Sequence, residues 1–433
     1  MNVVVVGGGA AGLIAAWRAA SCGASVVLLE KMPRVGTKIL ISGGGKCNVT
    51  HAGPIEVVRA AFRPKEAGFL KGPFLRFTNT DFTELLESRG VRLYTRPDGR
   101  IFPVPPVDAK DVVAVLEGVV RTAGVRIRTG VAVEGIAVEG TRATGVRVAG
   151  GDLLGADRVV LATGGSSYPA TGCTGDGWRW VAEFGHTIRP LTAALAPLYL
   201  ESGPGWSSEW SGVALRDCVL RGRKVGAPGS PGKERVRWRG DLLFTHKGVS
   251  GPVALGVSRE IAEVLPEESH VEVDFLPERS SEEVSVELAA WCRAHPRRGV
   301  AGFLEGRMPE RLEGDVLAAA GVAPDVRGAH LTAKDRNRLV ATLKGWNLGL
   351  VRAVPLERGE VVAGGVALEE VDPRTMESRR VPGLHLCGEV LDIAGPVGGY
   401  NLQAAWSTGY VAGEAAAAVR VRPLEDSSET PPR

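Results

Sequence analysis

Glycines near the N-terminus are the first residues whose spacing suggests chemistry. Gly7, Gly9 and Gly12 form a G-x-G-x-x-G pattern directly after the apolar run 3–6. Such a loop lets a strand turn tightly into a helix, and it lets a pyrophosphate approach the free N–H groups at the helix start. A carboxylate at the end of the next apolar run accepts hydrogen bonds from a ribose. The pattern predicts a dinucleotide site formed by Gly7, Gly9, Ala10, Ala11, Gly12, Glu30 and Lys31.

A second glycine cluster follows soon after this unit. Three consecutive glycines at 43–45 stand beside a cation, Lys46, and an amide, Asn48. Successive glycine N–H groups can form a concave nest that binds an anion. A mobile surface loop is the alternative interpretation. The cluster predicts cofactor contacts from Ser42, Gly43, Gly44, Gly45, Lys46, Cys47 and Asn48.

A third glycine-rich stretch, from 388 to 403, follows an apolar run and leads into a helical run at 404–419. A helix N-terminus at this point would stabilise negative charge on a bound ring. Glu389 or Asp392 would bind hydroxyl groups of a ligand, although either residue could simply cap a turn. The contacts predicted here are Gly388, Glu389, Gly399, Tyr400, Asn401 and Leu402.

Thr163 and Gly164 end another apolar run, and an ordinary β-turn explains them almost as well as a ligand contact does. A cofactor that reaches from residue 9 to residue 399 must be long. FAD places its isoalloxazine far from its adenine and needs backbone donors from distant parts of the chain. The glycine clusters therefore predict FAD rather than NAD alone.

No side chain stands out as a catalytic acid or base. The seven histidines show neither H-x-H nor H-E-x-x-H spacing, so no metal site is expected, and the absence of a C-x-x-C pair disfavours dithiol chemistry. Cys47 is interpreted as a small packed residue. His246, Tyr168 and Tyr400 are the candidates for a proton donor or substrate contact. A solvated loop is the alternative for the histidine, and core packing is the alternative for both tyrosines.

The elements that must position these residues follow from the apolar pattern. Apolar runs of four residues are typical of parallel strands covered on both faces. Four occur here, at 3–6, 26–29, 159–162 and 384–387, the last interrupted only by His385. An Ala-rich helix is predicted at 10–22 between the first two. Alternating segments broken by glycines predict an antiparallel meander over 125–154.

These elements predict an α/β fold with a discontinuous Rossmann-like FAD-binding domain, of the glutathione-reductase-like kind, formed by 1–189 and 351–419. An inserted domain at 190–350 is expected to be β-rich over 190–280 and helical over 281–350. Strand-like pieces at 242–245 and 271–275, and helical patterns at 281–293, 315–320 and 333–343, support this division. The polar tail 420–433 is expected to be disordered.

Composition narrows the function classes. The 52 basic and 49 acidic residues nearly balance, giving a net charge of +3, so no nucleic acid partner is expected. The N-terminus has no signal-peptide pattern and no apolar run is long enough to span a bilayer. With six scattered cysteines, we expect a reduced, cytoplasmic protein that binds no membrane and acts on a small molecule. The sequence does not predict an oligomeric state.

The chain resembles the bacterial BaiN/RdsA-like flavoproteins, a family that includes aminoacetone oxidases and a bile-acid-pathway reductase. The matching stretches run from residue 5 to residue 413 and include GTKILISGGGKCNVT, DGRIFPVPPVDAKDVV and LCGEVLDIAGPVGGYNLQAAWSTGYVAG. The resemblance implies FAD and adds Lys38 and Val133 to the expected cofactor contacts. Lys46 replaces the usual Arg with its charge kept, and His51 stands where Asn is common.

The resemblance leaves the reaction open. An oxidase acting on a small amine with O₂ and an NAD(P)H-dependent reductase of an activated C=C bond both pass hydride through FAD. Only one strand-linked G-x-G-x-x-G is present, so a nicotinamide donor would visit transiently. An RNA-modifying flavoprotein and a non-catalytic FAD-binding module are the alternatives.

Overall fold

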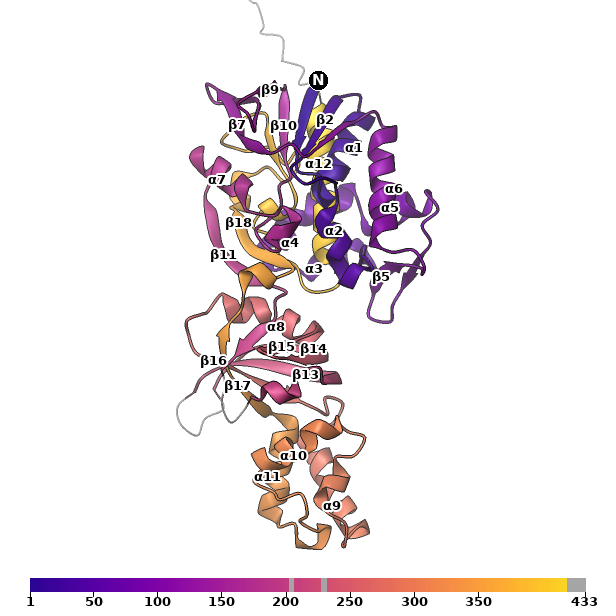
Figure 1. The fold of residues 1–433 in the computed structure, drawn as a ribbon, viewed down its shortest axis with the longest axis vertical. Helices are drawn as coiled ribbons and strands as arrows, with labels where there is room; N and C mark the ends of the chain where they lie inside the picture. Colours follow the sequence, from indigo (N-terminus) through magenta and orange to yellow (C-terminus); the bar gives the residue numbers. More distant parts are fainter. Residues whose placement is uncertain (202–205, 227–231, 419–433) are drawn as a thin grey trace, which may run out of the picture.

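The computed structural model describes residues 1–201, 206–226 and 232–418. Three parts follow one another along the long axis in Figure 1: an α/β domain, a barrel and a helical lobe. The tail expected to be disordered, 420–433, lies outside the described residues. Within the described part of the chain, no helix is long and apolar enough to cross a membrane.

A five-stranded parallel sheet forms the centre of the α/β domain. Its strand order is β19-β10-β1-β2-β6, with bounds β1 Asn2–Val6, β2 Ser25–Glu30, β6 Arg126–Thr129, β10 Arg158–Leu161 and β19 Leu384–Leu386. The residues of β10 and β19 are all buried, as are those of β1 apart from Asn2, because the sheet is covered on both faces. The predicted α/β class and its four apolar strands are confirmed.

The fifth strand corrects the sequence prediction. β6 was expected to open the antiparallel meander, yet it pairs parallel with β2 at the sheet edge. Its exposed arginines give it an amphipathic pattern, because an edge strand is only partly covered. The antiparallel sheet itself consists of β7 Val133–Glu139, β8 Arg142–Val148 and β9 Leu153–Gly155.

Two helices from opposite ends of the chain pack side by side against this domain (Figure 1): α1 Ala10–Ser21 and α12 Tyr400–Ala417. Gly409 and Gly413 make the close approach necessary, since a Cβ at either position would overlap a carbonyl oxygen of α1, that of Ala11 or Ala15. α12 begins four residues before the predicted run 404–419, because Gly399 in the left-handed region caps it. Residue 419 lies outside the described part.

Shorter elements complete the domain around the sheet. A three-stranded sheet has the order β3-β5-β4. The bounds are β3 Thr50–His51, β4 Leu93–Thr95, β5 Arg100–Pro103, α2 Thr37–Ile41, α3 Ile55–Ala60, α4 Pro64–Arg76, α5 Asn79–Glu87, α6 Ala109–Thr122 and α7 Asp176–Glu183. α5 and α6 each begin with a capping box, which satisfies N–H groups at the helix start.

A two-stranded antiparallel pair, β11 Ile188–Ala194 and β18 Val361–Val366, leads from the α/β domain into a closed barrel. The barrel order is β12-β15-β14-β13-β16-β17, and α8 packs on its strands. Its own core includes Trp210, Phe244 and Trp346. The bounds are β12 Leu198–Leu200, β13 Ala214–Lys224, β14 Glu234–Thr245, β15 Gly248–Ser250, α8 Pro252–Ala262, β16 Ser269–Asp274 and β17 Trp346–Ala353.

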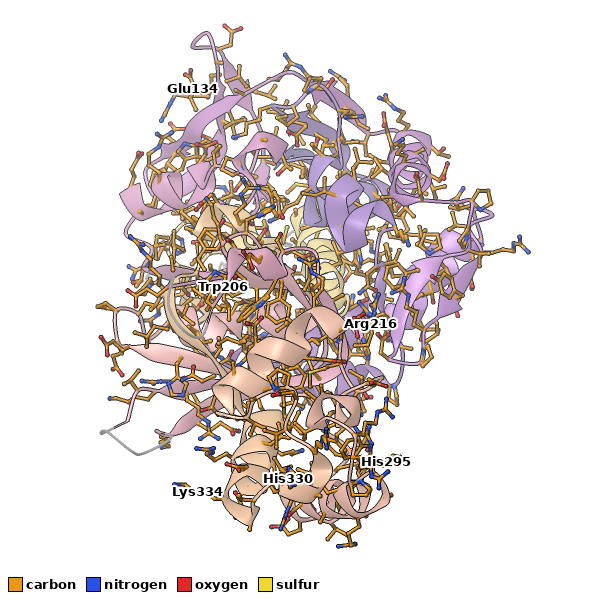
Figure 2. The ribbon with its side chains drawn as sticks, turned by 60° about the horizontal axis from the view of Figure 1, so that its bottom comes forward. Glu134, Trp206, Arg216, His295, His330 and Lys334 are labelled. Atoms are coloured by element: carbon orange, nitrogen blue, oxygen red, sulfur yellow. The ribbon has the colours of Figure 1, made fainter. Side chains whose placement is uncertain are left out.

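The helical lobe lies at the far end and contains α9 Ser281–Ala294, α10 Glu310–Ala319 and α11 Ala333–Lys344. Figure 2 shows His295, His330 and Lys334 at this end, away from Glu134 on β7. α10 starts five residues before its predicted start, at the residue after Pro309. The insert limits predicted at 190 and 350 fall inside β11 and β17, and α11 ends at Lys344 because the chain returns there to the barrel.

The glycines of α12 give a stability prediction. Gly409→Ala or Gly413→Ala forces a methyl group into the α1 backbone, so we expect a loss of about 1–3 kcal/mol or more in the free energy of unfolding. Gly118→Ala in the exposed face of α6 is the control, because a Cβ there meets open space. The control is expected to be neutral or stabilising by up to about 1 kcal/mol. Equal unfolding midpoints in urea for all three variants would show that the helices do not touch this closely.

Candidate functional site

One cavity of about 620 Å³ is lined by residues from most of the glycine clusters found in the sequence. It receives the N-terminus of α1, the N-terminus of α12, the loop after β10 and the 42–48 segment. Of the predicted cofactor residues, those that line it are Gly7, Gly9, Ala10, Ala11, Glu30, Lys38, Ser42, Gly43, Gly44, Asn48, Thr163, Gly164, Gly388, Glu389, Gly399, Asn401 and Leu402. Segments that are far apart in the sequence therefore form one continuous site.

At the start of α1 the three motif glycines differ in their surroundings. Gly9 is the N-cap residue and no side chain caps the helix, so the helix start is open to a ligand. A Cβ on Gly9 would meet nothing within 4 Å, whereas a Cβ on Gly12 would overlap the carbonyl oxygen of Gly7. Gly12 thus serves strand-to-helix packing and does not line the cavity, while Gly9 leaves space for a ligand.

Glu30 lines the cavity beside the Gly7–Gly9 loop. The Glu30 carboxylate accepts hydrogen bonds from the N–H groups of Gly8 at 2.7 Å and Met32 at 2.8 Å, which fixes its orientation. Lys31 does not line the main cavity, because its ammonium pairs with Asp176 at 2.7 Å. Lys31 and Val133 instead line a smaller adjoining cavity of about 40 Å³, which shares Gly7, Glu30 and Thr163 with the main one.

The 42–48 segment has the backbone of a nest. Gly43, Gly44 and Gly45 have φ of 57°, 67° and 84°, and Cys47 has φ of 55°. A Cβ on Gly44 would meet nothing within 4 Å, so the concave side is open. Gly45, Lys46 and Cys47 do not line the cavity. Burial raises the pKa of the Cys47 thiol to about 12, which supports the interpretation of a packed residue.

Asn48 joins the nest to α12. With its amide oriented to satisfy its neighbours, Asn48 accepts a hydrogen bond from the Gly399 N–H at 2.9 Å and donates to the carbonyl oxygens of Thr50 and Ile101. Gly399 has φ of 90° and leaves no room for a Cβ against Thr50. Asn401 binds both the N–H and the carbonyl of Gly395, which holds the preceding loop in place. The two glycine clusters are thereby fixed relative to each other.

Lys38 and Glu389 form an ion pair in the wall of the cavity. The Lys38 ammonium lies 2.7 Å from Glu389 Oε2 and 2.8 Å from Ser167 Oγ, and Glu389 Oε1 accepts from the Val362 N–H. Burial opposes the charge of Lys38, but the Glu389 carboxylate, which also forms a hydrogen bond with the ammonium, holds the Lys38 pKa above its ordinary value. Lys38 is therefore a cation held in a fixed position in the cavity wall.

The three catalytic candidates are placed very differently. Tyr168 lines the cavity in the left-handed region, with φ of 50°. Tyr400 does not line it, because its ring stacks on His51 with centroids 4.5 Å apart. His246 is exposed in the turn between β14 and β15 and is not among the lining residues. Asp392 likewise does not line the cavity.

Sequence reasoning missed several lining residues. Glu360 faces the cavity, and burial raises the pKa of its carboxyl although Lys38 opposes this. Nothing local in the sequence marks Glu360, because only the folding of β18 brings it to the site. The other missed residues include Arg96, Arg100, Phe102, Leu195, Pro252, Leu255, Ile393 and Val397. Arg100 and Phe102 lie in the stretch DGRIFPVPPVDAKDVV, but nothing in that stretch marks either residue as a cavity residue. Among the described residues, no group of three or more His, Cys, Asp or Glu side chains could hold a metal ion.

The raised pKa values of the buried thiols give a prediction about their reactivity. Burial raises the pKa of Cys47 and Cys218 to about 12 and also raises the pKa of Cys173, Cys292 and Cys387, so these thiols carry little thiolate at neutral pH. Cys22 is exposed. We expect Ellman's reagent to modify one thiol rapidly in the folded protein and the rest only after unfolding. Cys22→Ser should abolish the fast phase, and a fast phase that survives this substitution contradicts the burial of the others.

The sequence matches a known protein family and several characterised proteins. Residues 1–415 match the family described as HI0933-like protein Rossmann domain. The chain is 30% identical over 410 residues to a ribosomal RNA dihydrouridine synthase of Escherichia coli, which covers 94% of this chain and 96% of that protein. It is 33% identical over 421 residues to a 3-dehydro-bile acid delta(4,6)-reductase of Clostridium scindens, with coverage of 96% and 99%.

Solved structures agree on the fold. A 3-ketosteroid delta1-dehydrogenase from Sterolibacterium denitrificans superposes with a TM-score of 0.52 at 14% identity, covering 96% of this chain and 99% of that one. A 3-ketosteroid-delta4-(5alpha)-dehydrogenase from Rhodococcus jostii gives 0.50 at 16% identity, with 96% of both chains covered. The family predicted from the sequence motifs is confirmed, and this chain belongs to the HI0933-like Rossmann family.

Proposed function

We propose that this protein is an FAD-dependent oxidoreductase that reduces a carbon–carbon double bond conjugated to a carbonyl group, with NAD(P)H as a transient hydride donor. The observation that carries the proposal is the single cavity into which two helix N-termini and a glycine nest open. Helix N-termini and nests both favour negative charge. A long cofactor with a pyrophosphate at one end and a ring that gains negative charge at the other matches both features.

The residues present fit FAD. Gly9 and Gly44 leave open space where a Cβ would otherwise stand, which is the shape of a cradle for a ligand. Thr163 also lines the cavity, although its hydroxyl lies on the side of Gly177.

Each part of the cavity has a role in this proposal. The N–H groups of Gly9 to Ala11 would hold the pyrophosphate, and Glu30 would bind the ribose of the adenosine. Lys38 and Glu389 would contact the ribityl chain, which joins the pyrophosphate to the ring. The α12 start, with Gly399 and Leu402, would stabilise negative charge at the ring end. FAD would supply the hydride chemistry when bound.

Reduction of the double bond also needs a proton. Tyr168 and Glu360 line the cavity, and both can donate one. The raised pKa of Glu360 keeps its carboxyl protonated over a wider pH range than usual. These two side chains replace His246 and Tyr400 as our candidates for the acid.

The names of two relatives support the direction of the reaction. One is named as a delta(4,6)-reductase of a 3-dehydro-bile acid and the other as a dihydrouridine synthase of ribosomal RNA. Both names describe the addition of hydrogen to a carbon–carbon double bond near a carbonyl group. We therefore favour a reductase over an amine oxidase and over a non-catalytic FAD-binding module.

A ribosomal RNA substrate is the second candidate. Proteins of Escherichia coli and Haemophilus influenzae that are each 30% identical to this chain carry the synthase name. A uracil base has the same conjugated arrangement as the enone of a small molecule, so the same site chemistry would serve. The nearly balanced charge of the whole chain favours the small molecule.

The two motif glycines separate binding from folding. Gly9→Ala should leave the thermal unfolding of the apoprotein unchanged and weaken FAD binding at least about tenfold, because the methyl group occupies the open space over the helix start. Gly12→Ala should destabilise the apoprotein itself, because it overlaps the Gly7 carbonyl. Apoprotein titrated with FAD and followed by quenching of flavin fluorescence measures the first effect. FAD binding by Gly9→Ala at wild-type strength would contradict this placement of the pyrophosphate.

Anaerobic spectroscopy tests the reaction. We expect NADH or NADPH to bleach the bound flavin and cyclohexenone to restore its colour in the absence of air. Cyclohexanone, which lacks the double bond, is the matched control and should have no effect. Prereduced enzyme that regains its colour with ribosomal RNA, while the RNA gains the mass of two hydrogens, would favour the second candidate.

The remaining outcomes contradict the proposal. Bleaching by a small amine followed by recovery only in air would identify an amine oxidase. A flavin that no donor reduces would identify a non-catalytic module. A purified protein that is colourless and takes up no FAD would overturn the cofactor assignment.

A further inference from the structure

A hairpin that the proposed reaction does not use brings two arginines to the cavity. Arg96 directly follows β4 and Arg100 begins β5, with the Arg96 N–H bonded to the Arg100 carbonyl at 2.9 Å. Gly99, with φ of 82°, allows the tight turn between them. Both arginines are half-buried, and both line the cavity.

The hairpin lies at the α12 end of the cavity. A Cβ on Gly99 would strike the ring of His51, whose Nδ1 is 3.0 Å from the carbonyl oxygen of Gly398. Phe102, which follows Arg100 on β5, would contact a Cβ placed on Gly43. The arginines therefore lie near the ring end of the proposed cofactor and not near its pyrophosphate end.

Charge at this hairpin is only partly compensated. Arg100 Nε lies 2.8 Å from Asp98 Oδ2, and within the described part of the chain Asp98 forms no salt bridge with another cation. Burial opposes ionisation of Asp98, but hydrogen bonds from Arg100 and the charges of Arg100 and Arg96 hold its carboxyl pKa below the ordinary value, so the pair is ionised. Arg96 forms no salt bridge or side-chain hydrogen bond among the described residues. One positive charge is left over.

Arg96 is oriented although no carboxylate of the described residues lies at salt-bridge distance from it. Its guanidinium carbon lies 4.0 Å from the centroid of the Phe102 ring, a cation–π contact. Stacking of this kind fixes the plane of the guanidinium and leaves the N–H groups at its edge available. A planar, oriented guanidinium with free N–H groups is suited to bidentate binding of a carboxylate or phosphate.

Apolar side chains form part of the cavity wall at this end. Pro252 and Leu255 of α8, Leu195 at the end of β11 and Val397 beside Gly398 all line it. Leu255 and Val397 pack on a small cluster that contains Leu195. A molecule that fills this region would have an apolar body next to the α8 side chains and an anionic group near the hairpin.

We infer that Arg96, supported by Arg100, forms an anion-binding subsite at the ring end of the cavity, which holds a carboxylate or phosphate of the molecule that exchanges hydride there. This inference rests on the proposed function and adds the chemical class of its ligand. The anionic group has two sources, a carboxylate on an apolar unsaturated substrate or a phosphate of the nicotinamide donor. Both need the same guanidinium, so one set of variants distinguishes them.

The test uses the holoenzyme and two probes of nearly equal shape, sodium cinnamate and cinnamamide. Each is titrated into the oxidised enzyme and followed by the change in the visible flavin spectrum, which requires no turnover. NADPH is examined separately through the concentration dependence of anaerobic flavin bleaching. The variants are Arg96→Gln and Arg96→Lys, with Arg92→Gln as control because Arg92, the residue before β4, is exposed and does not line the cavity.

We expect Arg96→Gln to weaken either cinnamate binding or NADPH binding at least about tenfold, the loss typical of a hydrogen-bonded ionic contact. Loss of cinnamate alone identifies a substrate carboxylate, and loss of NADPH alone identifies a donor phosphate. Arg96→Lys should recover part of the loss, because it keeps the charge without the planar fork. Cinnamamide binding and the Arg92→Gln variant should be unaffected.

Three results would overturn the inference. The first is Arg96→Gln binding of both anions at wild-type strength, and the second is an equal loss in Arg92→Gln. The third is a loss of FAD affinity alone, which would show that Arg96 serves the cofactor. A failure of every donor to bleach the flavin would defeat the proposed function while the cinnamate titration still decides the subsite.

Discussion

The contact between α1 and α12 is the constraint on which the site depends. Gly409 and Gly413 allow the two helix backbones to touch, so the first and the last helix of the α/β domain lie as neighbours. Their N-termini consequently open into one cavity, with Gly9 at one and Gly399 at the other. Two positive helix ends at a set separation define a site for a ligand that is negative at two places. The strands β1 and β19 belong to the same parallel sheet and carry these helices to it.

The site also stores backbone strain, and buried contacts hold that strain in place. Tyr168 and Leu195 adopt the left-handed region and line the cavity, while Cys47 does so beside it. Such conformations cost of order 1–3 kcal/mol each and persist only when their surroundings enforce them. Cys47 is fully buried, and the Tyr168 N–H is bonded to the Glu357 carbonyl. The insert contributes as well, because Leu195, Pro252 and Leu255 close the cavity from the barrel side.

Patterns within short stretches of sequence were enough to predict the features that depend on neighbouring residues alone. The parallel strands, α1 and the glycine clusters follow from apolar runs and from positions where only glycine fits, such as Gly12 against the Gly7 carbonyl. Contacts between distant segments were not predictable in this way. Glu360, Arg96 and Leu255 come to the cavity through β18, a hairpin and a helix of the insert, and no motif connects them. The edge strand β6 was misassigned because its exposed arginines imitate a meander. Lys31 was expected at the cofactor but pairs with Asp176.

The most direct test of the account is a crystal structure of the protein with FAD bound. The account predicts that the pyrophosphate lies against the N–H groups of Gly9 and Ala10, and that the isoalloxazine lies beside Gly399 and Leu402. It also predicts that the side chains of Lys38 and Glu389 contact the chain that joins them. An isoalloxazine found at the Gly7 to Gly12 loop, or an FAD bound outside this cavity, would contradict the account.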